Sequence, residues 1–410
     1  MRDTELYAAL LGIKHPWTVV DVKLDVNSER IDVFLKDVSG VKHLCPKCQK
    51  SCSTYDHAEE RVWRHLDTCQ CDTYVHARLP RTKCDEHGVV EINAPWAGPR
   101  SSLTLRYECE IIDTIKECDL TGVTRLTGLT WDVVFTVMKR AVERGLERKP
   151  RRIPEYIGVD EKSFAKRHNY ETVVCDLQRG TVEYVVDDRD KESLLKYYRQ
   201  FSSEELSGVK AIAMDMWDPY ISATKKCIPD AEKKIVFDRY HATRYVNQAV
   251  DKVRRREHKA LSIEGDDRLK GTRHLWLYNE DNIPEWKKTE FSRLKSADLK
   301  TSRAWAIKES LRHFWDYTYQ KNAETYFKKW YFWATHSRLG PIIEAAKTLK
   351  VHISNIATYF KHGITNALSE GLNSKIQTIK NMACGFRNRE HYKLAIYFHC
   401  GGLELYPQLG

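Results

Sequence analysis

The chain has 410 residues and a formal net charge of +10, from 67 Lys and Arg against 57 Asp and Glu. Its length predicts two or three domains, and a hydrophobic content of 42% excludes a disordered chain. The sequence lacks an apolar run of about 20 residues, which a membrane helix needs, and its N-terminal apolar run is too short for a secretory signal. We therefore expect a cytoplasmic protein, and the positive charge modestly favours a nucleic-acid partner.

The first predicted domain, residues 1–95, consists mainly of strands. Residues 17–36 alternate apolar and polar side chains about a central turn, which predicts a β-hairpin. Two further strand-like stretches, RVWRHLD and TYVHARL, follow later in the domain. A sheet of this size has a small core, so we expect an additional source of stability in this region.

Two pairs of metal-ligand residues lie within the same domain, Cys45-x2-Cys48 and Cys84-x2-His87. Pairs of this spacing suit tetrahedral zinc, and a small zinc ribbon is stabilised by its metal. The alternative interpretation is a set of reduced thiols without metal. Cys52, Cys69 and Cys71 are spare thiols, and of these Cys69-x-Cys71 could compete for the role of the second pair.

Residues 100–149 have helical periodicity. Apolar residues recur at helical spacing up to about residue 118, a short segment ends at Gly128, and a longer helix follows Thr130, a typical N-cap residue. This order is that of a helix-turn-helix domain, in which Trp131 at the start of the last helix would face the major groove. Helical hairpins that serve only as packing units have the same pattern.

Beyond Pro150 and Pro154 the pattern becomes α/β. Three strands, a helix, a buried strand, a second helix and a final strand follow one another, which is the order of an α/β ribonuclease-H-like domain. In that fold the first and fourth strands lie side by side. The predicted strands cover residues 155–164, 170–178, 181–188, 209–215 and 233–238. The predicted segments are the first part of this domain (154–241), a long helical insertion whose Trp residues are mainly core (242–360), and the final helices of the domain (361–410).

Three acidic residues of this region could share metal ions. Asp160 lies on the first strand, Asp215 ends the fourth, and Glu370 lies on a late amphipathic helix. Such a trio suits phosphodiester chemistry with two divalent ions, and hard oxygen ligands favour Mg²⁺. Each residue alone also has an ordinary explanation as a turn, cap or solvated helical residue, and Glu161 and Asp218 are close rivals. A turn and a helix cap explain Asp187, Asp188 and Asp190 more readily.

Several segments, in their order along the chain, resemble the ISL3 family of bacterial insertion-sequence transposases. They are CPKC…KCDEHG, the predicted helix-turn-helix, IGVDEKSF, AIAMDMWDPY, VFDRYHATRYVNQAVDKVRR, NALSEGLNSKIQTIKN and GFRNREHY. The resemblance implies a DDE transposase whose triad is Asp160, Asp215 and Glu370. It also implies that Asp238 and His241 support the site, although a strand-end Asp and a helical His are the plain alternative. The ribbon departs from the family pattern, because its final ligand is a His and it contains extra Cys.

The resemblance further implies double-stranded DNA as the partner. We expect a homodimer to bind the terminal inverted repeats of a mobile element in the nucleoid, and the triad with Mg²⁺ or Mn²⁺ to cleave the element end and join it to target DNA. A Gly-rich phosphate loop is missing, so ATP is not expected. The open alternatives are a nuclease without strand transfer and a transposase-derived DNA-binding regulator with an inactive site. The expected phosphate contacts are Arg125, Lys139, Arg140, Arg144, Arg151 and Arg152.

Overall fold

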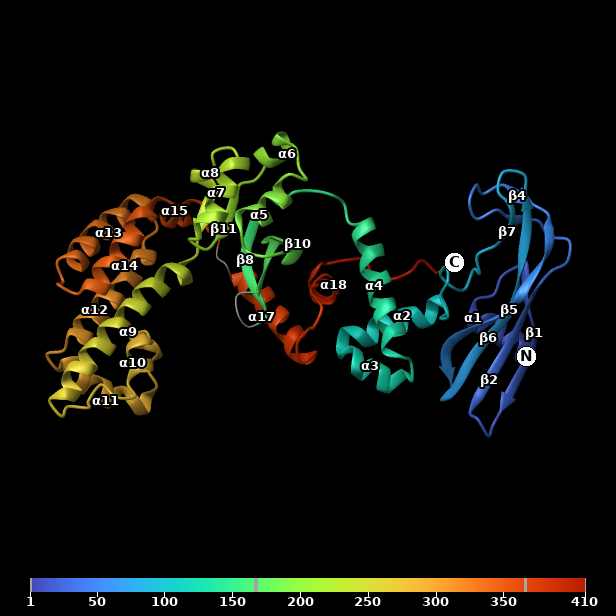
Figure 1. Ribbon diagram of the computed structural model, residues 1–410, viewed down its shortest axis with the longest axis horizontal. Helices are drawn as coiled ribbons and strands as arrows, with labels where there is room; N and C mark the ends of the chain where they lie inside the picture. Colours follow the sequence, from blue (N-terminus) through green and yellow to red (C-terminus); the bar gives the residue numbers. More distant parts are fainter. Residues whose placement is uncertain (1, 166–168, 365–366, 410) are drawn as a thin grey trace. The chain divides into compact units, whose positions relative to one another are not determined.

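A computed structural model describes residues 2–165, 169–364 and 367–409 (Figure 1). The chain divides into two compact units. The N-terminal unit comprises Met1–Pro150, Ile379–Gly385 and Leu394–Gly410, and the second unit comprises Arg151–Thr378 and Phe386–Lys393. Within the described ranges, no helix combines the length and the apolar character that crossing a membrane requires.

A five-stranded sheet forms the first part of the N-terminal unit. Its strands are β1 (Trp17–Asp25), β2 (Arg30–Asp37), β5 (Thr54–Thr68), β6 (Cys71–Cys84) and β7 (Gly88–Glu91), and helix α1 (Asp3–Leu11) precedes them. The predicted hairpin of β1 and β2 is confirmed. β2 pairs with β6 in parallel, and β5 and β7 pair with β6 in antiparallel fashion. Trp17, Trp63 and Trp96 lie together in the core of this sheet.

The hairpin of β5 and β6 is longer than the two strand-like stretches of the sequence indicate. Its turn consists of Cys69 and Gln70, with φ angles of 53° and 68°. Left-handed backbone at both positions closes a two-residue hairpin whose twist matches that of the strands. The two strands therefore remain paired up to Thr68 and Cys71.

Three helices follow within the N-terminal unit, α2 (Leu105–Glu117), α3 (Leu120–Thr127) and α4 (Trp131–Arg148). Side-chain oxygens of Thr104 and Asp119 accept hydrogen bonds from backbone N–H groups in the first turns of α2 and α3. Gly128 ends α3 at φ 67°, a conformation that glycine adopts without strain. Thr130 occupies the N-cap position of α4, as expected, but its side chain makes no capping hydrogen bond.

The C-terminal residues depart from the expected domain boundary. Sequence reasoning assigned 361–410 entirely to the catalytic domain, whereas 379–385 and 394–410 cluster with the N-terminal unit. Phe398 and Leu405 are buried in the same core as α2 and α4. Arg148 also donates a hydrogen bond to the backbone oxygen of Tyr406 at 2.7 Å. Burial of these apolar side chains stabilises the contact, and a strand-and-helix pattern gives no sign of it.

A mixed sheet forms the centre of the second unit, in the order β10-β9-β8-β11-β12. β8 pairs with β9, and β9 with β10, in antiparallel fashion, while β11 lies parallel to both β8 and β12. The predicted neighbourhood of the first and fourth strands is thus confirmed. The strands are β8 (Tyr156–Ala165), β9 (Asn169–Asp176), β10 (Thr181–Asp187), β11 (Ala211–Met214) and β12 (Ile235–Phe237). The helices between them are α5 (Lys191–Tyr198), α6 (Ser203–Ser207), α7 (Asp218–Cys227) and α8 (Ala231–Lys234).

The predicted helical insertion follows β12 and shares its hydrophobic core with the sheet. Its helices are α9 (Arg239–Ile263), α10 (Arg273–Leu277), η1 (Glu280–Asn282), α11 (Glu285–Ser296), α12 (Lys300–Leu311), η2 (Arg312–Asp316), α13 (Gln320–Thr335), α14 (Gly340–Val351), α15 (Ile353–Ala357) and α16 (Tyr359–His362). Of its Trp residues, 276, 305, 315 and 330 are buried, whereas Trp286 and Trp333 are exposed. The interpretation of most Trp residues as core is therefore confirmed.

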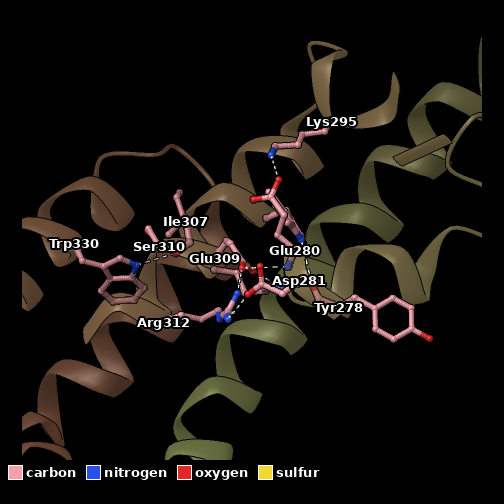
Figure 2. A network of polar contacts seen from close by, with 11 residues as sticks. Tyr278, Glu280, Asp281, Lys295, Ile307, Glu309, Ser310, Arg312 and Trp330 are labelled. Carbon is pink, nitrogen blue, oxygen red and sulfur yellow. Dashed lines mark hydrogen bonds and ion pairs between the residues drawn. The ribbon is translucent and has the colours of Figure 1, made fainter. Parts of the chain in front are cut away.

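Polar contacts also connect the helices of the insertion (Figure 2). Arg312 contacts Glu309 and lies 3.0 Å from Asp281. The indole N–H of Trp330 donates to the backbone oxygen of Ile307 at 2.9 Å. The contacts of Arg312 connect α12 with η1, and the hydrogen bond of Trp330 connects α13 with α12. The hydrogen bond also satisfies a buried indole N–H that would be costly without a partner.

Candidate functional sites

Four ligand-type side chains meet in the N-terminal unit. Cys45 and Cys48 lie in the turn between β3 (His43–Leu44) and β4 (Ser51–Cys52), and Cys84 and His87 lie in the turn between β6 and β7. Their ligand atoms all lie within 4.8 Å of one another. The two pairs that the sequence indicated thus meet at the open end of the β5–β6 hairpin, where β5 begins and β6 ends.

The spacing of these ligand atoms fits a tetrahedral zinc ion. Zinc–sulfur bonds of about 2.3 Å place neighbouring sulfurs about 3.8 Å apart. The Sγ atoms of Cys48 and Cys84 are 3.6 Å apart, and Nδ1 of His87 lies 3.9 Å from Sγ of Cys45 and 3.6 Å from Sγ of Cys84. The hydrogen bond with His87 lowers the pKa of the Cys84 thiol to about 6, which favours the thiolate that zinc binds.

The other thiols weighed from the sequence do not belong to the four-ligand group. Cys69 and Cys71 lie at the turn of β5 and β6, whereas Cys84 lies at the far end of β6, so this pair cannot serve the same site. Cys52 is buried in a cluster with Cys45 and Cys84. Its thiol, however, contacts the backbone oxygen of Lys50, and it is not a member of the four-ligand group.

Two of the predicted acidic residues lie at the same level of the second sheet. The parallel register aligns Ala213 with Gly158, so Asp215 and Asp160 are each two residues beyond an aligned pair. Neighbouring strands lie about 4.8 Å apart, and residues at equal register point to the same face. Each carboxylate also accepts a hydrogen bond from the next backbone N–H, at 2.7 Å for Asp160 and 2.6 Å for Asp215.

The third acidic residue, Glu370, lies on α17 (Ala367–Met382), which covers this face of β8. The amide of Asn373, one helical turn after Glu370, donates to the carboxylate of Asp160. Ser369, the residue before Glu370, is buried with its hydroxyl 3.6 Å from the thiol of Cys175 on β9. Glu370 itself is exposed. In the described part of the chain, only the four zinc-type ligands gather within 4.8 Å, so the three carboxylates are not drawn together that closely.

The two predicted supporting residues occupy different positions. Asp238 is the N-cap of α9, and its carboxylate accepts a hydrogen bond from the N–H of Tyr240 at 3.1 Å. His241 lies one turn later, with Nδ1 3.2 Å from Oδ1 of Asp215. Burial lowers the pKa of His241, but the carboxylates of Asp215, Asp238 and Asp160 outweigh burial, so the net pKa is raised. Burial raises the pKa of Asp215 while His241 lowers it, and the net pKa is lowered.

A pocket of about 210 Å³ opens beside Asp215, and two arginines line it. Arg189 is held by Glu161, with Nη1 3.0 Å from both carboxylate oxygens, and its guanidinium stacks on Trp217. This ion pair accounts for Glu161, the rival of Asp160. Arg244 lies on α9 after His241, is exposed, and has no ion-pair partner among the described residues. Arg244 is therefore a cation of this pocket that is available to an anion from outside.

The other acidic residues weighed from the sequence have separate places. Asp218 is the exposed first residue of α7. Asp190 caps α5, as the turn-and-cap interpretation predicted. Asp187 pairs with Lys393 at 3.0 Å, and Asp188 lies 3.5 Å from Arg389.

The predicted phosphate contacts fall into two groups. Arg144 lies 2.6 Å from the buried carboxylate of Glu108, and Arg152 lies 2.5 Å from the buried carboxylate of Asp176. These two arginines are therefore engaged in ion pairs with buried carboxylates. The other predicted phosphate contacts have no ion pair with a buried carboxylate among the described residues, and they are exposed or partly exposed: Arg125, Lys139, Arg140 and Arg151. Trp131, predicted to face the major groove, is also exposed.

Sequence reasoning missed Asn373, Arg189 and Arg244. Asn373 could have been found, because it follows Glu370 by one helical turn and so shares its face. No local signal distinguishes Arg244 from the other basic residues of α9, since its role depends on the pocket beneath it.

Comparison with known proteins gives two family matches and relatives along most of the chain. Residues 157–396 match the model of a family described as transposase, that of the ISL3 group, and residues 42–87 match the zinc-finger of transposases IS204/IS1001/IS1096/IS1165. The chain is similar to the transposase for insertion sequence element IS1557 of Mycobacterium tuberculosis, with 26% identity that covers 95% of this chain and 93% of the relative. It is also similar to the transposase for insertion sequence element IS1001 of Bordetella parapertussis, with 25% identity over 89% of this chain and 90% of the relative.

Proposed function

Because the chain belongs to the ISL3 family of insertion-sequence transposases, we propose that it is a DDE transposase that cleaves the ends of an element and joins them to target DNA. The observation that carries this proposal is the parallel pairing of β8 with β11, whose last aligned pair is Gly158 and Ala213. Asp160 on β8 and Asp215, the residue after β11, each lie two residues beyond that pair. Helix α17, which bears Glu370, packs against the face to which Asp160 points, as the contact with Asn373 requires. We regard the domain as ribonuclease-H-like, since its strand order and connections follow that pattern.

The donor set fits hard divalent cations. Asp160, Asp215 and Glu370 offer only carboxylate oxygens, the ligands that Mg²⁺ and Mn²⁺ prefer. When bound there, such ions would activate the attacking oxygen and stabilise the leaving oxygen of a phosphodiester. The residues of the chain hold the carboxylates in place. Asn373 orients Asp160, and the protonated ring of His241, with Nδ1 3.2 Å from Asp215, would offset the negative charge of that carboxylate.

We further propose that the N-terminal unit binds the terminal inverted repeats. The α2–α4 segment has the order of a helix-turn-helix, with the indole of Trp131 exposed at the start of its last helix. Arg125, Lys139, Arg140 and Arg151 are the proposed phosphate contacts, whereas Arg144 and Arg152 are set aside because of their internal ion pairs. Since two ends must be joined, we propose a homodimer on DNA.

The test is a cleavage and joining assay with labelled element ends and a target plasmid. We expect ends with a free 3′-hydroxyl and joined products, both lost with a chelator and restored by Mg²⁺. Asp160→Asn, Asp215→Asn and Glu370→Gln should each abolish both products at an unchanged melting temperature. Asp218→Asn, an exposed acid outside the pocket, is the matched control and should retain activity.

Other outcomes separate the alternatives. Cleavage without joining in the wild-type chain would identify a nuclease, and repeat binding without cleavage would identify a regulator. Cleavage that survives Asp215→Asn would refute the assignment of the triad.

A further inference from the structure

A cavity of about 400 Å³ lies in the N-terminal unit, and its lining does not include the four zinc-type ligands. Residues from the end of α1, the start of β1, the β3–β4 turn, the segment after β7 and the start of α2 line it, together with Leu409. This volume is in the range of small-molecule sites, which span roughly 300–1,000 Å³. Neither the sheet nor the zinc ribbon requires an opening of this size, because sheet cores normally pack without large voids.

The floor of the cavity is aromatic and contains an unused donor. Trp17 and Trp96 pack edge to face, with ring centroids 4.8 Å apart. Trp96 is only 7% exposed, and its Nε1–H has no hydrogen-bond partner among the described residues. Buried indole N–H groups normally find an acceptor, so this donor is suited to an acceptor that a ligand supplies.

The rim of the cavity is cationic. Lys14 and Arg106 line it, both are exposed, and neither forms an ion pair within the described ranges. None of the described lining residues carries a carboxylate. His65 also lines the cavity, but burial lowers its pKa to about 4, so its ring is neutral near pH 7. The local charge therefore comes from Lys14 and Arg106 and favours an anion.

We infer that this cavity binds one nucleotide, with its base against the indole of Trp96 and its phosphate between Lys14 and Arg106. A nucleotide combines a planar ring, carbonyl acceptors and an anionic phosphate, and each of these matches one feature of the cavity. An apolar peptide side chain would use the floor alone and leave both cations and the indole N–H unpaired. An unstacked nucleotide of bound DNA and a free mononucleotide share this chemistry. Binding of a nucleotide that belongs to bound DNA rests on the proposed function, whereas binding of a free mononucleotide does not.

The closing experiment uses the full chain and three probes. The first is a short labelled oligothymidine, the second is an abasic oligonucleotide with the same number of phosphates, and the third is thymidine monophosphate as competitor. We expect the base-containing oligonucleotide to bind more tightly than the abasic one. Trp96→Phe, which keeps a ring but removes the N–H donor, should weaken only the former, by about threefold to tenfold.

Matched variants control for stability and for charge. Trp63 also has a buried indole N–H without a partner in the described structure, but it lies outside the cavity, so Trp63→Phe should leave binding unchanged. Arg106→Gln should weaken both oligonucleotides and the mononucleotide, whereas Lys36→Gln, an exposed charge on β2, should have a smaller effect. Cross-linking of an iododeoxyuridine oligonucleotide should map to the peptide that contains Trp96 or Trp17.

Equal binding of the two oligonucleotides, equal effects of the two Trp variants, or cross-links confined to other peptides would overturn the inference. If thymidine monophosphate displaces the oligonucleotide, the cavity binds a free nucleotide. If it does not, the cavity binds nucleotides within DNA. Cleavage of element ends is measured in the same preparations. If cleavage depends on Asp215 but binding does not depend on the base, only the cavity assignment fails. Base-dependent binding without cleavage would instead refute the proposed function alone.

Discussion

The substitution Gly158→Ala tests the proposal that Glu370 acts together with Asp160 and Asp215. A Cβ at Gly158 would lie 2.5 Å from the hydroxyl of Ser369, 2.8 Å from Cδ2 of Leu177 and 3.1 Å from the thiol of Cys175. Ordinary contacts at such positions are 3.4–4 Å, so α17 or its neighbours must shift by about 1 Å. Overpacking of this kind costs about 1–3 kcal/mol. Because Ser369 directly precedes Glu370, the same shift should reduce cleavage by about 100-fold.

The assay combines single-turnover cleavage of element ends with thermal unfolding. Adding Ser369→Ala to Gly158→Ala removes the closest clashing atom and should restore part of the activity. Gly371→Ala is the control on the same helix, because a Cβ there meets nothing within 4 Å, and it should stabilise α17 by up to about 1 kcal/mol. Wild-type cleavage and stability in Gly158→Ala would refute the reasoning, since α17 would then not need this contact with β8 in the active enzyme.

Further substitutions test the remaining assignments. Arg144→Met leaves Glu108 buried without its partner and should cost about 3 kcal/mol in denaturant unfolding, whereas Arg125→Gln should leave stability unchanged and lower the salt dependence of DNA binding by about one unit. An equal loss of stability in both variants would contradict this distinction. Burial and Asp187 raise the pKa of Glu171 from 4.5 to about 8, so the folded state favours the protonated carboxyl. The contribution of this group to the free energy of unfolding is therefore fully present below about pH 4.5 and is lost as the pH rises toward 8. Between pH 5 and pH 8 the free energy of unfolding of the wild-type chain should fall by a few kcal/mol, and Glu171→Gln should remove this decline in melting curves. A parallel decline in both proteins would argue against the raised pKa of Glu171. Arg244→Gln should weaken DNA cleavage by about tenfold or more at unchanged melting temperature, because it removes the unpaired cation of the pocket, and an unchanged cleavage rate would exclude a phosphate contact there. Removal of zinc with a selective chelator should unfold the β3–β4 region and abolish repeat binding, as circular dichroism and a mobility-shift assay would record.

Features that depend on short stretches of chain were predicted well. The two ligand pairs Cys45/Cys48 and Cys84/His87 were visible as spacings, since each pair lies in one tight turn and zinc supplies the reason for their convergence. The order of strands and helices in the second unit followed from periodicity, and this order was enough to predict that the strands of Asp160 and Asp215 are neighbours. The placement of Glu370 beside them stays a prediction that the cleavage assays address.

Other features were decided by tertiary contacts between distant residues. The C-terminal tail belongs to the N-terminal unit, because Phe398 and Leu405 are buried in the core with α2 and α4. Arg144 looked like a phosphate contact in a basic stretch, but its side chain is held by the buried Glu108. The roles of Asn373 and Arg244 likewise depend on tertiary neighbours, because the amide of Asn373 contacts Asp160 and Arg244 lines the pocket beside Asp215. A sequence pattern reports the period and spacing of nearby side chains, whereas the partner of a buried charge or donor is set by chain segments that fold against it from far away.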